Sequence, residues 1–444
     1  MRTTRLDFVE PFDVYRRVRE AYEHTFLFES LVGPERLAEF SFIGFAPEAT
    51  LRVEENRFVS EGEKRRLSDP RAVGEFIRDR MRRVKSDARF AGGLVGYVSY
   101  DFVKFLEKIA LHRREGCRMP DLEMGLYLDG IVFDHKQRKA TYFTHDGDRT
   151  AELKKILREP VEPPHPFHSS SIGEDLDRKG FEYSVYRAKE HIAAGDIFQV
   201  VLSRERRFET SGDILQVYER LRAVNPSPYM YFIEFGPRRV VGSSPEMLVR
   251  VEGREVSTYP IAGTRRIGGD AAETARLGAE LLADEKEKAE HAMLVDLARN
   301  DVGRVAEYGS VKVPEYMKVE RFSHVQHIVS KVVGSLRRDR DAFDALASLF
   351  PAGTVSGAPK VRAMEIIDSL EASRRGPYAG VVGYLSFSGA LDTAITIRSL
   401  AAEGSTMRIR AGAGIVADSK PEREFEETQE KLGALTQVLE GEKR

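Results

Sequence analysis

The chain has 444 residues, of which 41% are hydrophobic and 32% are charged, so it can bury a large core and form two or three domains. Its 69 basic and 71 acidic side chains leave a formal charge of -2 and form no basic stripe, which argues against nucleic acid as a partner. A single cysteine, Cys117, excludes a disulfide framework and a zinc site built from several thiolates. No apolar run resembles a signal peptide or a membrane span, so we expect a cytoplasmic protein without a membrane partner.

The first third of the chain is expected to be rich in strands. Short apolar runs at Phe26–Phe28 and Leu94–Val98 are separated by turn signals at Gly92-Gly93, Asp129-Gly130 and Asp146-Gly147-Asp148. This pattern indicates an α+β region.

A change in composition divides the chain. Residues 158–180 are rich in proline, serine and histidine, which predicts neither helix nor strand. We therefore expect an N-terminal α+β region over residues 1–157, a linker over residues 158–180 and a second domain over residues 181–440.

The second domain is expected to be a mixed α/β or α+β unit with an extensive sheet. The final helix begins near Ser419, whose Ser-x-x-Glu spacing to Glu422 resembles a capping box. The other expected elements are a helix over Phe181–Ala194, strands over Ile197–Leu202 and Tyr229–Phe235, one long helix over Asp270–Asn300, and strands over Val381–Phe387, Thr393–Leu400 and Met407–Ile415.

Two pairs of glutamates have i, i+3 spacing on predicted helices, which places both carboxylates of each pair on one side of its helix. The pairs are Glu287/Glu290 and Glu424/Glu427. Glu290 shares a face with apolar residues, so its carboxylate should need a cation or hydrogen-bond donors. If the helices face each other, carboxylates from both would suit magnesium, which often takes one or two protein carboxylates. The alternative, which is more common in a chain this charged, is that both pairs are solvated helix surface.

Three other features could contribute to a binding cleft. His327, in a segment where polar and apolar residues alternate, could act as a general acid or base, although a lone histidine is more often structural. Arg398 ends an apolar run and could bind a carboxylate, or could form an ordinary ion pair. The glycine-rich stretches at 353–357 and 412–414 allow a small anion to approach the backbone, but neither has dinucleotide or phosphate-loop spacing.

Several segments, taken in chain order, together resemble a known family. They are Pro260–Thr264, Glu290–Asp301, Ser323–His327, Phe350–Lys360, Ile397–Arg398 and Arg410–Asp418. In this order they resemble the chorismate-utilising enzymes, and specifically component I of anthranilate synthase. The resemblance implies an α+β fold in which helices flank a large, antiparallel-rich β-sandwich core.

The resemblance also implies that the substrate is chorismate and that the cofactor is Mg²⁺. Glu290 and Glu427 would hold the ion against the ring carboxylate of the substrate, with Glu287 and Glu424 supporting its waters. Thr354 and His327 correspond to residues near the bonds that break, so they would polarise these bonds and transfer protons. Glu287 would complete the group of catalytic residues. The positions implied to bind the enolpyruvyl carboxylate are Tyr378, Arg398, Gly412, Ala413 and Gly414, and those implied to lie against the ring are Gly263 and Thr264.

Two positions separate the members of this family. Members that activate water carry a lysine base where this chain has Gln199, and ammonia needs no such base. Aminodeoxychorismate synthases typically carry a nucleophilic lysine where this chain has Ala262. Together these residues favour amination at C2 with loss of the C4 hydroxyl, followed by elimination of pyruvate. The nearest alternative within the family stops at 2-amino-2-deoxyisochorismate.

The N-terminal half contains a segment similar to the tryptophan-binding element of the family. Leu27-Phe28-Glu29-Ser30 departs from that element at Phe28, and Pro228-Tyr229-Met230 matches the second wall of the same pocket. We therefore expect feedback inhibition by tryptophan through Glu29, Ser30, Pro228, Tyr229 and Met230. The alternative is that these apolar strands only pack in the core.

The chain lacks a glutaminase segment of the form Gly-x-Cys-x-Gly. Ammonia should therefore come from solution or from a separate glutamine amidotransferase subunit, component II, in a hetero-oligomer. A catalytically inactive tryptophan-binding regulator is the alternative from another class of protein. It is disfavoured because Glu290, Glu427, His327 and Arg398 are all present.

Overall fold

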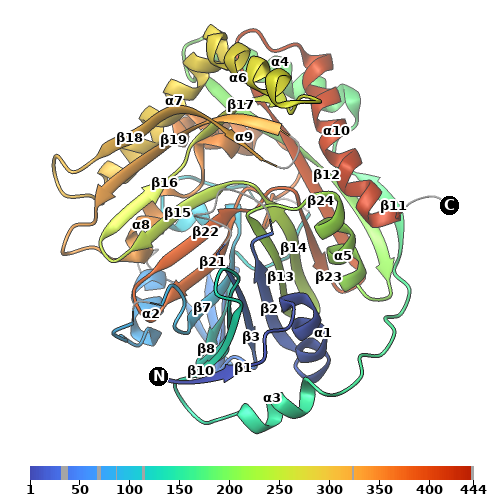
Figure 1. Cartoon of the computed structure of the whole chain (residues 1–444). Coiled ribbons are helices and arrows are strands. Elements are labelled where there is room, and N and C mark those ends of the chain that lie inside the picture. The colour runs from blue at the N-terminus through green and yellow to red at the C-terminus, as the bar shows by residue number, and fades with distance from the viewer. Residues whose placement is uncertain (32–38, 68–71, 87, 113–115, 323–324, 442–444) are drawn as a thin grey trace.

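The structure is a computed structural model that describes residues 1–31, 39–67, 72–86, 88–112, 116–322 and 325–441. Within these residues the strands form two antiparallel sheets of twelve strands each (Figure 1). Both sheets contain strands from before and after residue 180. The segment at 158–180 is therefore not a boundary between sheets.

The first sheet, sheet A, joins the N-terminal strands to those around the last helix. Its strands, in spatial order, are β1 (Arg2–Leu6), β10 (Lys139–Thr144), β9 (Asp129–Asp134), β3 (Phe40–Phe45), β2 (His24–Glu29), β13 (Tyr229–Phe235), β14 (Arg238–Ser244), β23 (Ser399–Glu403), β24 (Thr406–Ile415), β12 (Gln199–Ser211) and β11 (His168–Glu174), with β20 (Gly357–Ala358) paired to β12.

The second sheet, sheet B, has the same mixed origin. Its strands, in spatial order, are β17 (Ile261–Arg266), β19 (Val325–Ser335), β16 (Glu255–Thr258), β15 (Met247–Glu252), β22 (Leu391–Ile395), β21 (Val381–Ser386), β7 (Gly93–Val98), β8 (Leu122–Tyr127), β4 (Ala49–Glu54), β5 (Arg57–Ser60) and β6 (Glu63–Arg66), with β18 (Lys312–Arg321) paired to β19.

The two sheets pack through an aromatic core. Successive side chains of a strand point to opposite faces, so Tyr231 and Ile233 of β13 enter this core while Phe232 faces the other way. On β7, Val95 and Tyr97 enter the same core from sheet B. The expected antiparallel β-sandwich flanked by helices is therefore confirmed.

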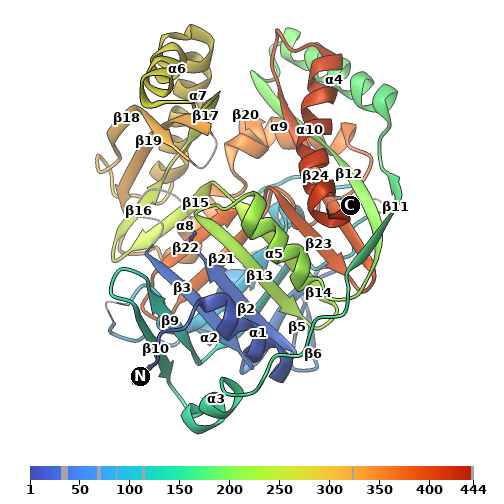
Figure 2. The same cartoon turned by 45° about the vertical axis from the view of Figure 1, so that its right-hand side comes forward.

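Helices cover the outer faces of both sheets (Figures 1 and 2). Apolar residues of α1, α5 and α10 pack on sheet A, and those of α2, α7 and α8 pack with sheet B. The helices are α1 (Pro11–Ala21), α2 (Ala72–Arg80), α3 (Thr150–Ile156), α4 (Arg178–Ala193), α5 (Leu215–Val224), α6 (Ala271–Ala283), α7 (Glu285–Gly303), α8 (Ala342–Leu349), α9 (Lys360–Leu370) and α10 (Pro421–Glu440), with 3-10 turns η1 (Tyr100–Phe105) and η2 (Gly353–Val355).

Two predicted elements are each divided in the structure. The expected helix over Asp270–Asn300 is two helices, because Asp284 adopts an extended conformation and its side chain accepts hydrogen bonds from the first backbone N–H groups of α7. The expected strand over Thr393–Leu400 is also divided. β22 ends at Ile395, and residues 396–398, of which Arg398 has a left-handed φ of 51°, pass the chain from sheet B to β23 in sheet A.

Three smaller predictions were wrong. Residues 168–174 of the expected linker form β11. Their side chains do not favour a strand, but their backbone groups pair with those of β12. Asp129-Gly130 opens β9 and is not a turn. α10 begins at Pro421, close to Ser419 as expected, but the expected capping box is absent, because Lys420 precedes the helix and makes no side-chain cap. Among the described residues, none of the helices combines the length and apolar character needed to cross a bilayer.

Candidate active site

A cleft containing about 1270 Å³ of empty space, part of it open solvent, lies between two groups of elements. One wall comes from β17, β19 and α7 and the other from β12, β24 and α10, which stand on opposite sides of the upper half of Figure 2. Most of the predicted substrate, catalytic and metal positions line it, namely Gly263, Thr264, Glu290, His327, Thr354, Tyr378, Arg398, Gly412 and Gly414. The motif residues Ser323 and His324 lie outside the described residues.

Two chain crossings between the sheets meet at this cleft. Residues 245–246 connect β14 of sheet A to β15 of sheet B, and residues 396–398 return the chain from β22 to β23. The crossings hydrogen-bond to each other, since the Ile395 N–H donates to the Glu246 carbonyl at 3.0 Å and the Ser243 N–H donates to the Arg398 carbonyl at 3.2 Å. They therefore place Glu246 and Arg398 side by side although 152 positions separate them in the sequence.

Arg398 presents a cation to the cleft. Its side chain remains accessible to solvent, yet the surrounding protein displaces part of its hydration and lowers the guanidinium pKa, an effect that Glu246 opposes. No described residue forms a hydrogen bond with this guanidinium. A planar cation with unused donors is suited to a carboxylate.

Glu246 is the acid whose charge acts on this cation. The Thr354 hydroxyl donates to its carboxylate at 2.8 Å. Burial raises the pKa of Glu246 to about 7, although the Thr354 hydrogen bond and Arg398 act to lower it. A carboxyl group that keeps its proton near neutral pH can act as a general acid in the cleft.

His327 faces the cleft as a neutral imidazole. Its Nδ1 lies 2.7 Å from the Gly263 carbonyl oxygen and 3.2 Å from the Thr264 hydroxyl. A carbonyl can only accept, so we assign the ring proton to Nδ1, which leaves Nε2 as a base. Burial lowers the pKa of His327, Arg398 lowers it further, and the Gly263 hydrogen bond partly opposes both effects.

The opposite end of the cleft is acidic. Glu290 accepts a hydrogen bond from the Gln199 side-chain amide at 3.1 Å, and burial, Glu287 and Glu427 all raise the pKa of Glu290. Glu287 also pairs with Arg265 at 3.2 Å. A bound cation would reduce the electrostatic repulsion between these carboxylates.

The predicted magnesium ligands fit that ion in number and chemistry. In the part of the chain that the structure describes, no group of three or more His, Cys, Asp or Glu side chains could hold a metal alone. Magnesium often takes only one or two protein carboxylates and completes its shell with water and substrate. The buried Gln199 Oε1 accepts no hydrogen bond from any residue that the structure describes, so it offers an acceptor beside Glu290. Glu427 pairs with Lys431 at 2.6 Å, and Lys431 also donates to the Gly412 carbonyl at 2.9 Å.

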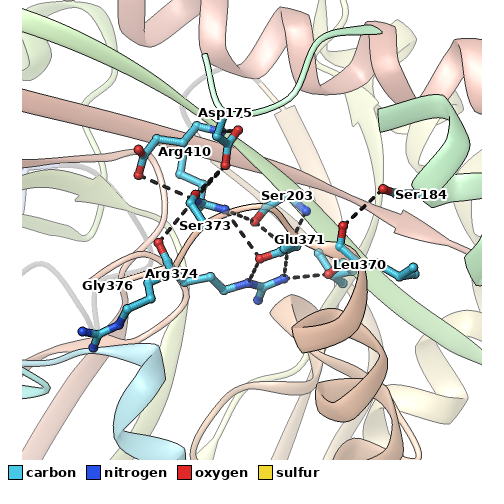
Figure 3. A network of polar contacts seen from close by, with 12 residues as sticks. Asp175, Ser184, Ser203, Leu370, Glu371, Ser373, Arg374, Gly376 and Arg410 are labelled. Atoms are coloured by element: carbon cyan, nitrogen blue, oxygen red, sulfur yellow. Dashed lines mark hydrogen bonds and ion pairs between the residues drawn. The ribbon is translucent and has the colours of Figure 1, made fainter. Parts of the chain in front are cut away.

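A buried polar network supports the floor of the cleft (Figure 3). Arg410 lines the cleft, but its guanidinium is engaged by Asp175 at 3.1 Å and lies 3.5 Å from Glu371. Although burial acts to raise it, Arg375 and Arg410 hold the pKa of Glu371 below its usual value. Arg410 is thus occupied by protein partners, whereas Arg398 has its donors available.

Alternation along β24 determines which glycine-rich residues reach the cleft. Gly412 and Gly414 line it, whereas the Ala413 side chain points into the hydrophobic core. A methyl group on Gly412 would lie 2.9 Å from the Tyr378 hydroxyl. The absence of a side chain there therefore leaves room for Tyr378, a second predicted carboxylate-binding residue.

Sequence reasoning assigned no role to Glu246, although the chain contains a signal for it. Glu246 is the only charged residue between Val240 and Val249, and it directly follows Pro245 between two apolar strands. A carboxylate in such a position must be buried or must face a cavity, where it needs partners. Sequence analysis likewise assigned no role to Lys431, which lines the cleft.

A second cavity, with about 520 Å³ of empty space, lies between the two sheets. The predicted tryptophan-binding residues Glu29, Ser30, Pro228, Tyr229 and Met230 all line it. The Glu29 carboxylate is already bound, because Tyr218 donates to it at 2.8 Å and Arg222 pairs with it at 2.9 Å. The assignment of a ligand to this cavity stays a prediction.

Known proteins share this fold and much of this sequence. A family model for chorismate binding enzymes matches residues 62–437. Component 1 of anthranilate synthase from Methanothermobacter thermautotrophicus is 49% identical over 437 residues, covering 98% of this chain and 93% of the relative. The same component from Saccharolobus solfataricus is 43% identical, covering 98% of each chain. The crystal structure of anthranilate synthase component I from Streptococcus pneumoniae matches with a TM-score of 0.80 at 37% identity, over 90% of this chain and 92% of that one.

The chain therefore belongs to the family of chorismate binding enzymes and shares the fold of a member of known structure. Within that family, the relatives named above are component 1 of anthranilate synthase. An isochorismate synthase from Escherichia coli shares the fold at 21% identity, with a TM-score of 0.73.

Proposed function

We propose that this chain acts as component 1 of an anthranilate synthase. It would convert chorismate and ammonia to anthranilate and pyruvate, the first step of tryptophan biosynthesis. The names of its relatives support this reaction. The observation that carries it is that Arg398, a cation to which no described residue hydrogen-bonds, shares the cleft with two acids. Glu246 beside it has a pKa raised to about 7, and Glu290 has a pKa that burial raises and that Glu287 and Glu427 raise further.

The two ends of the cleft would hold the two carboxylates of the substrate. Arg398 and Tyr378 would bind the enolpyruvyl carboxylate, with the backbone of Gly412 beside them. Glu290 and Glu427 would hold Mg²⁺, which when bound anchors and polarises the ring carboxylate. Fixing both carboxylates orients the ring for attack by ammonia.

Proton transfers would fall to Glu246 and His327. As the C2–N bond forms and the C4–O bond breaks, Glu246 would give its proton to the hydroxyl, which leaves as water, and the nitrogen would release one proton in return. His327 Nε2 would then take the C2 proton while the C3–O bond breaks, and the departing enolpyruvate would be protonated to pyruvate. Gln199 is a neutral amide and cannot deprotonate water, which favours ammonia over water as the nucleophile.

The decisive assay uses purified chain, chorismate, Mg²⁺ and an ammonium salt at mildly alkaline pH, and follows the fluorescence of the aromatic product. We expect anthranilate to form. Consumption of chorismate without an aromatic product would instead identify an enzyme that makes 2-amino-2-deoxyisochorismate or aminodeoxychorismate.

Ammonia would reach this chain in the cell from a partner glutamine amidotransferase, component II. The absence of a Gly-x-Cys-x-Gly segment supports a glutaminase activity that resides on a separate subunit. The same assay with glutamine in place of ammonium should give no anthranilate from the purified chain. Turnover with glutamine alone would contradict it.

The second cavity would bind tryptophan as a feedback inhibitor. Ser30 lines this cavity and is 9% exposed, so a Ser30→Arg side chain would fill it. We expect Ser30→Arg to weaken inhibition by tryptophan about tenfold or more, within the usual range of coupling between sites. Ser30→Ala keeps the cavity open and should stay sensitive. Unchanged inhibition of Ser30→Arg would exclude this cavity as the regulatory site.

A further inference from the structure

The Arg398 turn has a conformation that its own residue type disfavours. Arg398 is not a glycine, yet its φ is 51°. A side chain in this left-handed region is strained, and such strain persists only when surrounding contacts hold the backbone in place. The contacts that hold this turn therefore control where the guanidinium lies.

Two hydroxyl-bearing residues supply these contacts. The Ser243 N–H donates to the Arg398 carbonyl at 3.2 Å, and the Ser399 hydroxyl donates to the Ile397 carbonyl at 2.7 Å. Both serines are buried, Ser243 at 0% and Ser399 at 8% exposure. Water cannot readily replace either hydrogen bond.

Each contact continues to the wall of the second cavity. The Tyr231 hydroxyl pairs with the Ser399 hydroxyl. Ser399 already gives its one proton to Ile397, so Tyr231 must be the donor. Tyr231 lines the second cavity. By the other route, the hydroxyls of Ser243 and Ser227 pair at 2.8 Å. Ser243 gives its one proton to the Asn225 carbonyl, so Ser227, which precedes the cavity residue Pro228, is the donor.

Gly242 makes the Tyr231 route possible. A Cβ at Gly242 would lie 2.4 Å from the Tyr231 hydroxyl and 2.5 Å from that of Ser399. The Tyr231 side chain can therefore reach across β14 to Ser399 only because position 242 has no side chain. This arrangement links the aromatic core of the sandwich to the cleft.

We propose that Tyr231 and Ser399 are positioning residues that hold the Arg398 turn in its carboxylate-binding conformation and transmit occupancy of the second cavity to it. This rests on the proposed function, in which the cleft binds chorismate and the cavity binds tryptophan. A ligand that shifts the Tyr231 ring would withdraw its hydroxyl from Ser399. The turn, no longer fully held, would relax, and Arg398 would bind the substrate carboxylate less well.

The test compares Tyr231→Phe and Ser399→Ala with a matched control, Tyr15→Phe. Tyr15 is also a buried tyrosine in a hydroxyl pair, with Thr25 at 2.9 Å, but it does not line the cleft or the second cavity. For each variant, the KM for chorismate and kcat are measured with saturating ammonium, with and without tryptophan. Calorimetry measures tryptophan binding directly, and thermal melting checks folding.

We expect Ser399→Ala, which removes both hydrogen bonds, to raise KM about tenfold with kcat within about twofold, because the contact it supports acts on binding. Tyr231→Phe keeps the ring and should raise KM by less. In both variants tryptophan should still bind, but its effect on the chorismate KM should fall toward none. The double variant should resemble Ser399→Ala, because the Tyr231 hydroxyl acts on the turn through its hydrogen bond to Ser399.

Parent-like KM and tryptophan sensitivity in both variants would overturn this inference alone, and so would the same changes in Tyr15→Phe. A parent chain that binds neither chorismate nor tryptophan would overturn the proposed function and this inference with it. The parent measurements therefore distinguish the two failures.

Discussion

Replacing Glu246 by glutamine should lower kcat by about 10²- to 10⁴-fold, the usual contribution of a general acid. Glu246 is the acid whose raised pKa keeps it protonated near neutral pH, and it lies against Thr354 and Arg398 in the cleft. Glutamine has a similar shape and still accepts the Thr354 hydrogen bond, but it has no acidic proton to transfer. Steady-state assays at a constant concentration of free ammonia measure the loss.

The same change should make the protein more stable at neutral and alkaline pH. Burial raises the folded-state pKa of Glu246 from 4.5 to about 7, so the stability linked to its proton is fully present below about pH 4.5 and is lost as pH rises through about 7. Glutamine does not ionise and should avoid this loss, which we place at about 1–3 kcal/mol. Melting curves of parent and variant should coincide near pH 4.5 and diverge by pH 8.

Glu123→Gln is the matched control. Glu123 is 1% exposed and pairs with Arg238 at 2.6 Å, away from the cleft, so the variant leaves a partly buried guanidinium without its anionic partner. It should lose stability and keep kcat, the opposite of Glu246→Gln. A Glu246→Gln enzyme with parental kcat would refute the general-acid assignment.

Glu290→Gln should abolish magnesium-dependent turnover. Burial, Glu287 and Glu427 raise the pKa of Glu290, so a bound cation would relieve this end of the cleft, and glutamine removes the charge that attracts it. In the parent, Mg²⁺ should raise the melting temperature, since a ligand that binds only the folded state stabilises it. In the variant this rise should disappear, which tests the metal site without an activity assay.

Glu285→Gln controls for a change on the same helix. Its side chain is 86% exposed and pairs only with Lys288 among the described residues, at 2.7 Å, so the variant should keep both turnover and the magnesium-induced rise in melting temperature. A parental response to magnesium in Glu290→Gln would remove Glu290 from the metal site.

Local sequence patterns predicted the elements that depend on local interactions. The strand at Tyr229–Phe235 has the predicted bounds, and α4 begins within three residues of its predicted start. Patterns failed where a long-range partner decides the structure. The strand β11 forms in a segment without strand composition, because β12 offers it hydrogen bonds. Asp284 ended a helix that the apolar spacing continued, because its side chain caps α7.

The sequence by itself determined the family and most of the residues that line the cleft, because those residues belong to motifs such as Pro260–Thr264 and Arg410–Asp418 that can be read locally. Only the tertiary structure decided which of them are available for a ligand. Nothing in the sequence shows which of the two arginines, Arg398 or Arg410, can bind a ligand. In the structure, Asp175 and Glu371 engage the Arg410 guanidinium, whereas no described residue hydrogen-bonds to that of Arg398. The raised pKa of Glu246 likewise arises from burial where two sheet crossings meet, which depends on residues far apart in the chain.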